Sequence, residues 1–523
     1  MSRDCVLAVD LGTSGPKVAL VAVDGAILDS DYEPTELVLT PDGGVEQDPD
    51  DWWRAVTAAS RRMLERGAVA PDAVIGVCCT AQWMGTVAVD AEGRHLMNAL
   101  TWMDARGADA VAEVIGGRIA VQGYDPRKLR RWVKVSGGAP SRSGKDPVAH
   151  ILWIEAHRPD VHRAAQTYLE PKDYLNLRLT GRAVTTVDCI ASHWVTDNRD
   201  LARVDYDPDL LALARLDRAH LPDIIRSVDV VGPLRSEAAA ELGVPAGIPV
   251  VGGTPDVQSA TLGSGAVADF AAHLYLGTSS WITCHVPFKK CNVLTQVASL
   301  PSAVPDRYVM GDDQDTAGAC LVWLRDQVLW PDDALGGGPA PDDAFARIDA
   351  LAASAPPGSG GVIFTPWLNG ERTPVDDHTI RASWSNTSLG TTRAHLVRAV
   401  LEGVAYNTRW LLGAVEKFAG RRLEPLRAIG GGARSDLWCR IHADVLERTV
   451  EQVGDPQAAN VRGAGFLGIV GLGRSSFEEL ARSVPVTAVY EPDPGNAPTY
   501  RALARELPRL YSRTKSIHGR LNA

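Results

Sequence analysis

The sequence lacks the features of a membrane-spanning or secreted protein. Among its 523 residues, no stretch approaches the roughly 18 uncharged apolar residues that span a bilayer. The first residues, MSRDCVLAVDLG, reach an aspartate and a glycine too soon for a signal peptide. Only eight cysteines are present and none forms a CxxC pair, which excludes a disulfide scaffold. We therefore expect a soluble protein of a reducing compartment, the cytoplasm.

Several catalytic and binding signatures are also missing. The sequence contains no GxxxxGK[ST] phosphate loop and no HExxH pair, and its histidines and cysteines lack the spacing of a zinc site. The formal net charge of −11 argues against general binding to nucleic acid or to an anionic membrane. Hydrophobic residues make up 45 % of the chain and charged residues 22 %, as is typical of a globular protein with a large core.

Apolar strands followed by helices predict a mixed or parallel sheet with helices packed on it. A helix is expected after the capping pair Asp48-Pro49, and a longer one over 153–180. Another is expected over 393–418, followed by a strand at 426–429 and a helix over 433–448.

A short motif recurs in the two halves of the chain. Leu11-Gly-Thr-Ser14 follows one apolar strand, and Leu276-Gly-Thr-Ser279 follows another. Small-residue turns present backbone N–H groups and hydroxyls to one point without side-chain bulk, which suits phosphate oxygens. Four residues recur by chance fairly often, but their place after a strand in each half predicts two related domains, each with a phosphate-binding loop.

Two aspartates and a lysine lie near these turns in the sequence. Asp10 ends the first strand, and because a carboxylate repels phosphate, Mg²⁺ is its natural companion. Lys17, on the outgoing strand, can neutralise a terminal phosphate. Asp256 follows a strand and a glycine turn, where it is either a helix cap or a general base for a substrate hydroxyl. A plain hairpin with a capping aspartate explains Asp10 alone, whereas the combination suits phosphoryl transfer.

Seven segments, in order along the chain, resemble the FGGY carbohydrate kinases of the sugar-kinase and actin-like superfold, nearest to the xylulokinases. They are Asp10–Lys17 (DLGTSGPK), Glu46–Trp53 (EQDPDDWW), Lys172–Gly181 (KDYLNLRLTG), Leu276–Ser280 (LGTSS), Leu368–Pro374 (LNGERTP), Arg398–Tyr406 (RAVLEGVAY) and Ile429–Asp436 (IGGGARSD).

The resemblance implies an α/β fold of two RNase H-like domains, residues 1–262 and 263–523, with the active site in the cleft between them. The first domain would hold the sugar, the first phosphate loop and the base, and the second would hold the other phosphate loop and the adenosine. The implied activity is transfer of the γ-phosphoryl group of ATP, with Mg²⁺, to a keto-sugar or polyol. A homodimer is compatible with the family, although no stripe in this sequence marks an interface.

Residue roles follow from the resemblance position by position. It implies that Asp256 is the catalytic base and that Asp10 assists the metal. The residues implied to contact the nucleotide are Thr13, Ser14, Lys17, Gly277, Thr278, Gly318, Gly431, Gly432 and Asp436. The residues implied to contact the sugar are Trp83, Met84, Asp104 and Asp256.

The sequence departs from the xylulokinase pattern on the sugar side. Where that family has GQMHG, Trp83 and Met84 replace the methionine and the histidine that contact the sugar. Val257 replaces a polar amide, and His150 replaces a lysine. A site built to pair a substrate hydroxyl discriminates by about 10⁴ against an analogue that lacks it. We therefore predict that ATP-dependent phosphorylation is retained and that the acceptor is altered.

Several alternatives remain open from the sequence. The acceptor is xylulose, or ribulose, a tetritol, a deoxy-sugar or glycerol, and Trp83 is either a substrate contact or a packing residue. A non-catalytic sugar or nucleotide sensor on the same scaffold is a second hypothesis, which the retained Asp256 and Lys17 disfavour. An actin-like or chaperone-type ATPase is a third, which the GERTP and KDYL segments disfavour.

Overall fold

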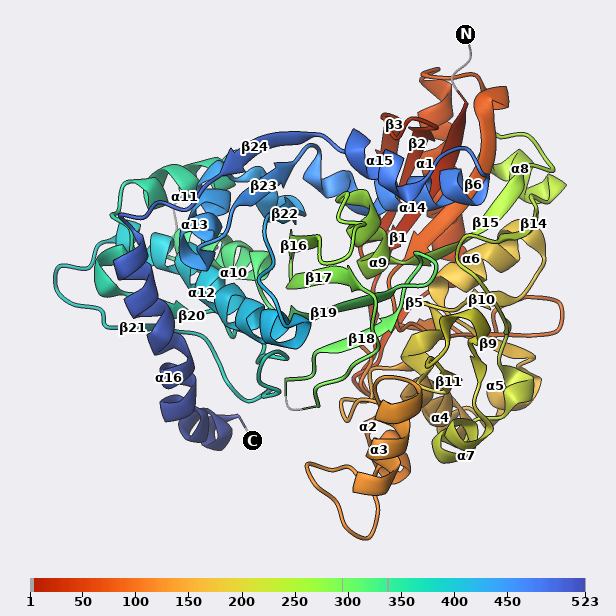
Figure 1. The fold of residues 1–523 in the computed structure, drawn as a ribbon, viewed down its shortest axis with the longest axis horizontal. Helices are drawn as coiled ribbons and strands as arrows, with labels where there is room; N and C mark the ends of the chain where they lie inside the picture. The colour runs from red at the N-terminus through yellow and green to blue at the C-terminus, as the bar shows by residue number, and fades with distance from the viewer. Residues whose placement is uncertain (1–3, 294, 336–337, 523) are drawn as a thin grey trace.

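Two β-sheets, each covered by helices, form the framework of the protein (Figure 1). The structure is a computed structural model that describes residues 4–293, 295–335 and 338–522. The N-terminal sheet has six strands in the order β14-β15-β6-β1-β2-β3, and the C-terminal sheet has seven in the order β18-β19-β17-β16-β22-β23-β24.

The strands of the N-terminal sheet are β1 (Cys5–Gly12), β2 (Gly15–Ala22), β3 (Ile27–Tyr32), β6 (Val74–Ala81), β14 (Val230–Pro233) and β15 (Pro249–Pro255). Those of the C-terminal sheet are β16 (Ala272–Leu276), β17 (Ser280–Val286), β18 (Ala298–Pro301), β19 (Tyr308–Gln314), β22 (Leu426–Ile429), β23 (Val450–Val453) and β24 (Val486–Tyr490).

The two sheets repeat one arrangement. In the first, β1 forms an antiparallel hairpin with β2 and pairs in parallel with β6, which pairs in parallel with β15. In the second, β16 forms a hairpin with β17 and pairs in parallel with β22, which pairs in parallel with β23. The two LGTS motifs occupy the corresponding hairpin turns. The predicted pair of related α/β units is present.

Two of the predicted helices form as expected. The α1 helix (Pro49–Glu65) begins at Asp48, whose side chain accepts a hydrogen bond from the N–H of Asp50 at 2.9 Å. The α12 helix (Arg393–Ala419) ends at Gly420, which takes the left-handed conformation with φ of 73°. Capping chemistry therefore predicted both boundaries closely.

The continuous helix predicted over 153–180 is wrong. The segment contains the end of α4 (Pro147–His157), α5 (Pro159–Ala164), the strand β9 (Thr167–Leu169) and α6 (Pro171–Thr180). Pro159 and Pro171 lack the N–H that a continuing helix needs, and each instead opens a new helix at its first position. The helix predicted over 433–448 is shorter: a 3₁₀ turn over 431–434 precedes α13 (Asp436–Leu446).

Two helices cross between the halves of the chain. They are α9 (Asp256–Gly263), which follows the last N-terminal strand, and α14 (Ala459–Gly471), which lies beside β1 and β6 in Figure 1. A Cβ atom on Gly263 would lie 1.8 Å from the Ala459 carbonyl oxygen, and one on Gly463 would lie 1.9 Å from that of Ser259. Backbones in such contact have no room for a side chain at either glycine.

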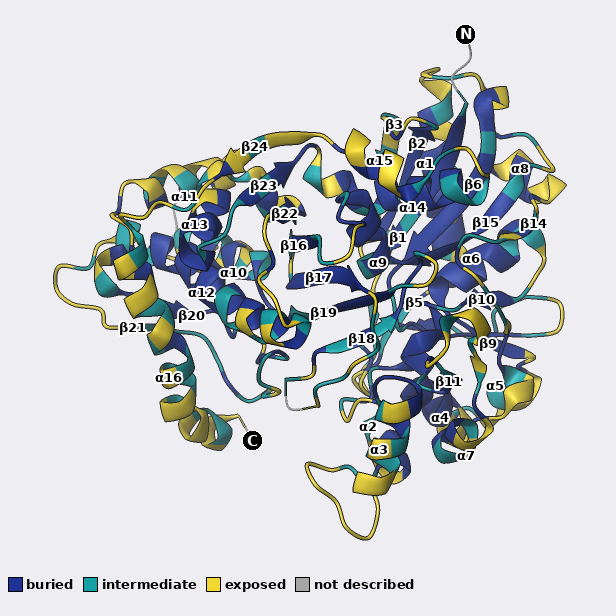
Figure 2. Cartoon of the chain, viewed as in Figure 1, coloured by how far each residue is buried: buried dark blue, intermediate teal, exposed yellow. Residues whose placement is uncertain are grey.

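The α14 helix also covers one face of the N-terminal sheet. Its Gly465 packs against Val21, and its Gly468 packs against Val6 and Cys78. Phe466 and Leu467 join the buried core shared by the two halves, and Figure 2 shows the central strands around it as buried. The chain of the C-terminal half therefore returns to complete the core of the first.

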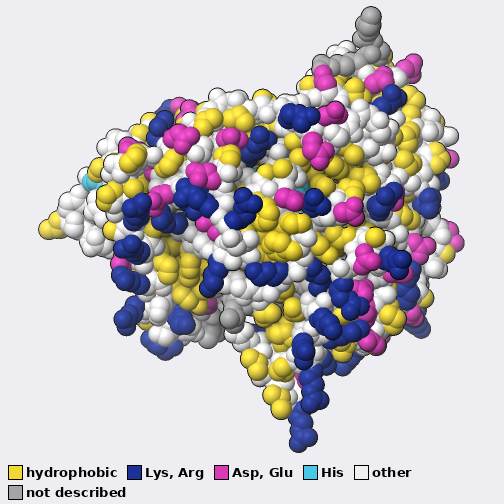
Figure 3. Space-filling view, in the orientation of Figure 1, with side chains coloured by type: hydrophobic (Ala, Val, Ile, Leu, Met, Phe, Trp, Pro, Cys, Tyr) yellow, Lys and Arg dark blue, Asp and Glu magenta, His cyan; other side chains and the backbone are white. Residues whose placement is uncertain are grey.

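The surface in the view of Figure 3 mixes both signs of charge. Lys and Arg side chains gather toward the lower tip of this view, near α3 (Pro126–Val135). Acidic and basic side chains are mixed over the rest of the visible surface. In the described part of the chain, no helix combines the length and apolar character needed to traverse a bilayer.

The glycine crossing yields a stability prediction. Gly463→Ala is expected to lower the free energy of unfolding by about 1–3 kcal/mol or more, because the new methyl group overlaps the Ser259 carbonyl. Gly413→Ala is the matched control: this glycine is exposed inside α12 with open space around it, so alanine should stabilise by about 0.5–1 kcal/mol. Melting temperatures measured by calorimetry test both, and an unchanged melting temperature for Gly463→Ala would contradict the crossing.

Candidate active site

Asp10 and Asp256 project from the same edge of the N-terminal sheet. Asp10 lies near the carboxyl end of β1, and Asp256 directly follows β15 as the first residue of α9. Strand β6 lies between β1 and β15 and is parallel to both, so the carboxyl ends of the three strands meet at this edge. Both aspartates are half-buried, as expected for side chains that line a cleft.

Both carboxylates have raised pKa values, and the charge of Asp10 acts on Asp256. Burial and the charge of Asp10 raise the pKa of Asp256 to about 7. Burial raises the pKa of Asp10 to about 6, against the opposing effects of Lys17 and the side chain of Asn460. One buried carboxylate oxygen of Asp10 has no hydrogen-bond partner among the described residues. An orphaned acceptor beside a second carboxylate fits a divalent cation.

A bulge in β15 aims Asp256 into this edge. The register between β15 and β6 shifts between Val251 and Thr254, and Gly253 takes a φ of 78°. A Cβ atom there would lie 2.0 Å from the Cys79 carbonyl oxygen. Only glycine accepts both this backbone conformation and this close approach.

The KDYL segment holds the bulge in place. The Gly252 carbonyl accepts hydrogen bonds from the ammonium group of Lys172 at 3.0 Å and from the side-chain amide of Asn176 at 2.7 Å. Lys172 is buried and forms an ion pair with the adjacent Asp173. The segment recognised in the sequence therefore positions the backbone that precedes Asp256.

The first small-residue loop is tied into its surroundings. The Thr13 hydroxyl donates to Oε1 of Gln82 at 3.2 Å and accepts from the indole N–H of Trp102 at 3.0 Å. Ser14 is exposed. Lys17, paired with Asp10 across the hairpin, donates from Nζ to the carbonyl of Gln457 at 2.7 Å. This contact links the first loop to the C-terminal half.

The second loop joins the start of α10 (Gly318–Trp323). The N–H of Gly318 donates to the Gly277 carbonyl at 2.7 Å, and the Thr278 carbonyl accepts from the N–H of Ala317 at 2.8 Å. A Cβ atom on Gly318 would lie 2.5 Å from the Gly277 carbonyl oxygen. The structure thus brings Gly277, Thr278 and Gly318 together, and their contact with a nucleotide stays a prediction.

The predicted adenosine segment lies close to the first loop. A Cβ atom on Gly431 would lie 3.3 Å from the side-chain nitrogen of Gln457, whose carbonyl binds Lys17. Gly432 packs against the Trp438 ring. Asp436 opens α13, and its carboxylate accepts hydrogen bonds from the Tyr490 hydroxyl at 2.8 Å and from the Gln452 amide at 3.2 Å. Asp436 is therefore engaged in the fold, and its contact with a nucleotide stays a prediction.

On the predicted sugar side, Trp83 and Met84 are both held in defined conformations. The indole N–H of Trp83 donates to the Cys189 carbonyl at 2.9 Å, so the ring is fixed rather than free to turn. Met84 has a φ of 66°, a conformation that is uncommon for a residue with a side chain. Both side chains are half-buried.

Asp104 is less accessible than the sequence suggested. It is fully buried, and its carboxylate binds the Arg106 guanidinium at 2.7 Å and the N–H of Val45 at 3.0 Å. His150 hydrogen-bonds the Asp104 carbonyl at 3.1 Å, and burial lowers the pKa of His150 to about 4, so the ring is neutral at pH 7. Asp104 is therefore held by Arg106 and Val45, and its direct contact with a sugar stays a prediction.

Two residues near the carboxylate pair were missed by sequence reasoning. Tyr275 lies in β16 two residues before Gly277, and its adjacency to the repeated motif was the one signal available. Asn460 lies in the first turn of α14 and acts on the pKa of Asp10 from the opposite half of the chain. Nothing in the sequence near Asn460 indicates this placement.

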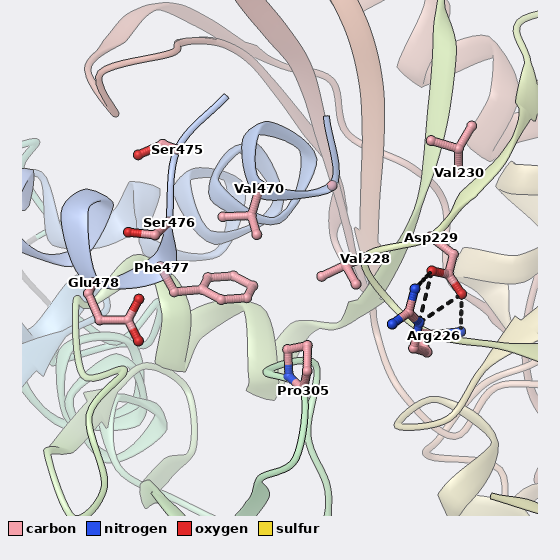
Figure 4. A pocket seen from close by; sticks show the side chains of 11 residues that line it. Arg226, Val228, Asp229, Val230, Pro305, Val470, Ser475, Ser476, Phe477 and Glu478 are labelled. Carbon is pink, nitrogen blue, oxygen red and sulfur yellow. Dashed lines mark hydrogen bonds and ion pairs between the residues drawn. The ribbon is translucent and has the colours of Figure 1, made fainter. Parts of the chain in front are cut away.

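A separate groove of about 450 Å³ opens between the halves, away from these residues (Figure 4). Val228 and Val230 line it from the N-terminal half, and Pro305, Val470 and Phe477 line it from the C-terminal half. The guanidinium of Arg226, at its rim, is already paired with Asp229. None of the predicted site residues lines this groove.

Comparisons with known proteins match the chain almost end to end. The N-terminal domain model of the FGGY family of carbohydrate kinases matches residues 5–263, and the C-terminal domain model matches residues 272–472. A xylulose kinase from Staphylococcus epidermidis is 27 % identical over 523 residues, covering 99 % of this chain and 98 % of that protein.

Solved structures share the fold. A gluconate kinase from Lactobacillus acidophilus superimposes with a TM-score of 0.86 at 23 % identity, covering 99 % of this chain and 100 % of that one. A xylulose kinase from Rhodospirillum rubrum does so with a TM-score of 0.82 at 28 % identity, covering 98 % and 100 %. The predicted fold class is confirmed.

The raised pKa of Asp256 predicts a pH dependence. A general base acts only when deprotonated, so kcat/KM for phosphoryl transfer is expected to rise with pH up to about 7 and to level off above it. An aspartate with an ordinary pKa near 4 would instead give a flat profile from pH 5 to 9. Initial rates measured across this range decide between the two, and a flat profile would contradict the assignment of Asp256.

Proposed function

The chain belongs to the FGGY family of carbohydrate kinases, and from this premise we propose that it transfers the terminal phosphoryl group of ATP to a hydroxyl of a keto-sugar or polyol. The supporting observation is the Asp10–Asp256 pair, placed beside the first small-residue loop, where Lys17 joins the N-terminal half to Gln457 of the C-terminal half. Phosphoryl transfer needs positioned phosphates, charge neutralisation and a group that accepts the hydroxyl proton. This arrangement supplies all three.

Asp256 is the proposed base. Its pKa near 7 makes it strong enough to accept the proton of an acceptor hydroxyl and yet substantially ionised at neutral pH. The unpartnered oxygen of Asp10 suits Mg²⁺, which when bound neutralises phosphate charge beside the two carboxylates. Lys17 would supply further positive charge to the terminal phosphate.

The loops suit a nucleotide because their residues are small and several carry hydroxyl groups, which can approach phosphate oxygens without bulk. Thr13 and Ser14 would face the phosphates from the first half, and Gly277, Thr278 and Gly318 from the second. A Cβ atom on Gly318 would meet the Gly277 carbonyl oxygen, so only glycine permits the start of α10 to contact the second loop this closely. Gly431 and Gly432 would hold the adenosine, within reach of Gln457 and hence of Lys17.

The acceptor is proposed to differ from D-xylulose. Trp83 presents a fixed aromatic face, and Met84 and Val257 add apolar surface where xylulokinases have hydrogen-bonding side chains. A deoxy, methylated or differently arranged polyol suits such a wall better than a fully hydroxylated pentulose. The similar proteins include a gluconate kinase as well as xylulose kinases, so overall likeness does not select the substrate.

The domain boundary, the cellular compartment and the oligomeric state of the protein are also proposals. We place the domain boundary at residues 262 and 263, with α14 of the second unit packed on the sheet of the first. All eight cysteines are free thiols and seven are buried, which supports the cytoplasm as the compartment. A homodimer stays a prediction from the family.

Release of ADP tests the proposal. Mg·ATP is supplied with pentuloses, tetritols, hexuloses, deoxy-sugars or glycerol, and one acceptor is expected to raise ADP release well above the rate without acceptor. Asp256→Asn should abolish this increase while leaving ATP affinity nearly unchanged, because the amide cannot accept the proton. Asp72→Asn, at an exposed aspartate in a 3₁₀ turn, is the matched control and should behave as wild type.

Each outcome has a distinct meaning. A highest rate on D-xylulose would contradict the altered acceptor and leave the kinase proposal standing. ATP binding without stimulation by any acceptor would contradict the kinase proposal and favour a sensor. Full activity in Asp256→Asn would remove Asp256 from the role of base.

A further inference from the structure

Tyr275 lies on β16 against the backbone of the second loop, and the charges of Asp256 and Asp10 act on its phenol. On β16 its neighbours Leu274 and Leu276 point into the buried core, so its own side chain projects from the opposite face. The ring stacks on Trp281 with centroids 3.6 Å apart and planes inclined by 8°. This stacking fixes the phenol, which is half-buried, in one orientation.

Two glycines from separate nucleotide segments make room for the ring. A Cβ atom on Gly277 would lie 2.2 Å from Cε1 and 2.3 Å from the hydroxyl oxygen of Tyr275. A Cβ atom on Gly430 would lie 3.1 Å from Cε2 on the other edge of the ring. The phenol therefore rests on the backbone of the second loop and touches the segment predicted to hold adenosine.

The charges of both carboxylates act on the Tyr275 hydroxyl, which stays protonated. Burial, then the charge of Asp256, then that of Asp10 raise the pKa of Tyr275 to about 12. Among the described residues no group forms a hydrogen bond with this hydroxyl. At neutral pH the site thus contains a neutral, fixed and unused hydrogen-bond donor between the second loop and the proposed base.

We propose that the Tyr275 hydroxyl donates a hydrogen bond to a nonbridging oxygen of the terminal phosphoryl group of the bound nucleotide. This inference rests on the proposed function, which places the nucleotide phosphates between Gly277 and the Asp10–Asp256 pair. A phosphoryl oxygen at that point would accept a hydrogen bond from the uncharged Tyr275 hydroxyl. Without that hydroxyl, the same side of the oxygen would face only the two carboxylates. The aromatic stack holds the donor ready, so little rearrangement is needed during transfer.

Calorimetric titration with two probes tests this contact without an acceptor. The nonhydrolysable ATP analogue AMP-PNP carries the terminal phosphoryl group, and ADP lacks it. Each nucleotide is titrated into the protein in the presence of Mg²⁺. Tyr275→Phe keeps the stack on Trp281 and removes only the hydroxyl. We expect it to weaken AMP-PNP binding about tenfold and to change ADP binding less than twofold, since a hydrogen bond to a charged group is lost.

Tyr206→Phe is the matched control. Its hydroxyl donates to the Pro222 carbonyl at 2.7 Å in the N-terminal half, outside the proposed site, so its removal should leave both affinities unchanged. A purely structural role of Tyr275 predicts equal losses for both probes, and a blocking role predicts tighter AMP-PNP binding in Tyr275→Phe. Either result, or equal AMP-PNP affinity in wild type and variant, would overturn the proposal.

The same measurements distinguish a failure of the Tyr275 proposal from a failure of the proposed kinase activity. Wild-type protein that binds neither probe, or shows no acceptor-dependent ADP release, would overturn the kinase proposal itself. Wild-type protein that binds AMP-PNP and turns over, while Tyr275→Phe matches it in both, would overturn only the role of Tyr275. With the contact in place, the turnover of Tyr275→Phe is expected to fall at least tenfold, with an unchanged KM for the acceptor.

Discussion

The charge of Asp10 acts on Asp256 at the carboxyl ends of three parallel strands, and the proposed chemistry of the site depends on this pair of carboxylates. Strand β6 separates the two strands that carry the carboxylates, so their distance is set by sheet geometry rather than by flexible loops. The Gly252 carbonyl, held by Lys172 and Asn176, fixes the bulge that precedes Asp256. Burial, and after it the charge of Asp10, raise the pKa of Asp256 to about 7, the range useful to a base.

The C-terminal half completes this edge through a few close contacts. The helices α9 and α14 cross at glycines, and Lys17 reaches the carbonyl of Gln457 just before α14 begins. From the second half, Asn460 lowers the pKa of Asp10, and the charges of both carboxylates raise the pKa of Tyr275. Because α9 starts at Asp256 itself, any change in the angle of the crossing is transmitted directly to the proposed base.

Local chemistry made much of the fold predictable from the sequence. Asp48 and Gly420 defined helix ends, and the two LGTS turns predicted the paired hairpins. The helix expected over 153–180 failed because apolar periodicity alone does not reveal the strand that pairs with β7 (Val87–Val89), although Pro159 and Pro171 were visible signals.

Some residues of the candidate site were likewise predictable from the sequence, and others were not. Asp10 lies near the end of one strand and Asp256 directly follows another, and the carboxyl ends of these strands meet, so their proximity was predictable once parallel pairing was expected. Asp104 was predicted as a sugar contact, but it is buried, and its carboxylate binds the Arg106 guanidinium and the N–H of Val45. Sequence spacing does not reveal this ion pair. Tyr275 and Asn460 reach the carboxylates only through the packing of the two halves, which no local pattern encodes.

The most direct test of this account is the pKa of Asp256 itself. Carboxyl-¹³C aspartate labelling followed by NMR titration, with the resonance assigned by Asp256→Asn, measures it in wild type and in Asp10→Asn. The account predicts a midpoint near 7 in wild type and a lower midpoint in Asp10→Asn, because the neighbouring charge is gone. A midpoint near the ordinary value of about 4 in both proteins would contradict it.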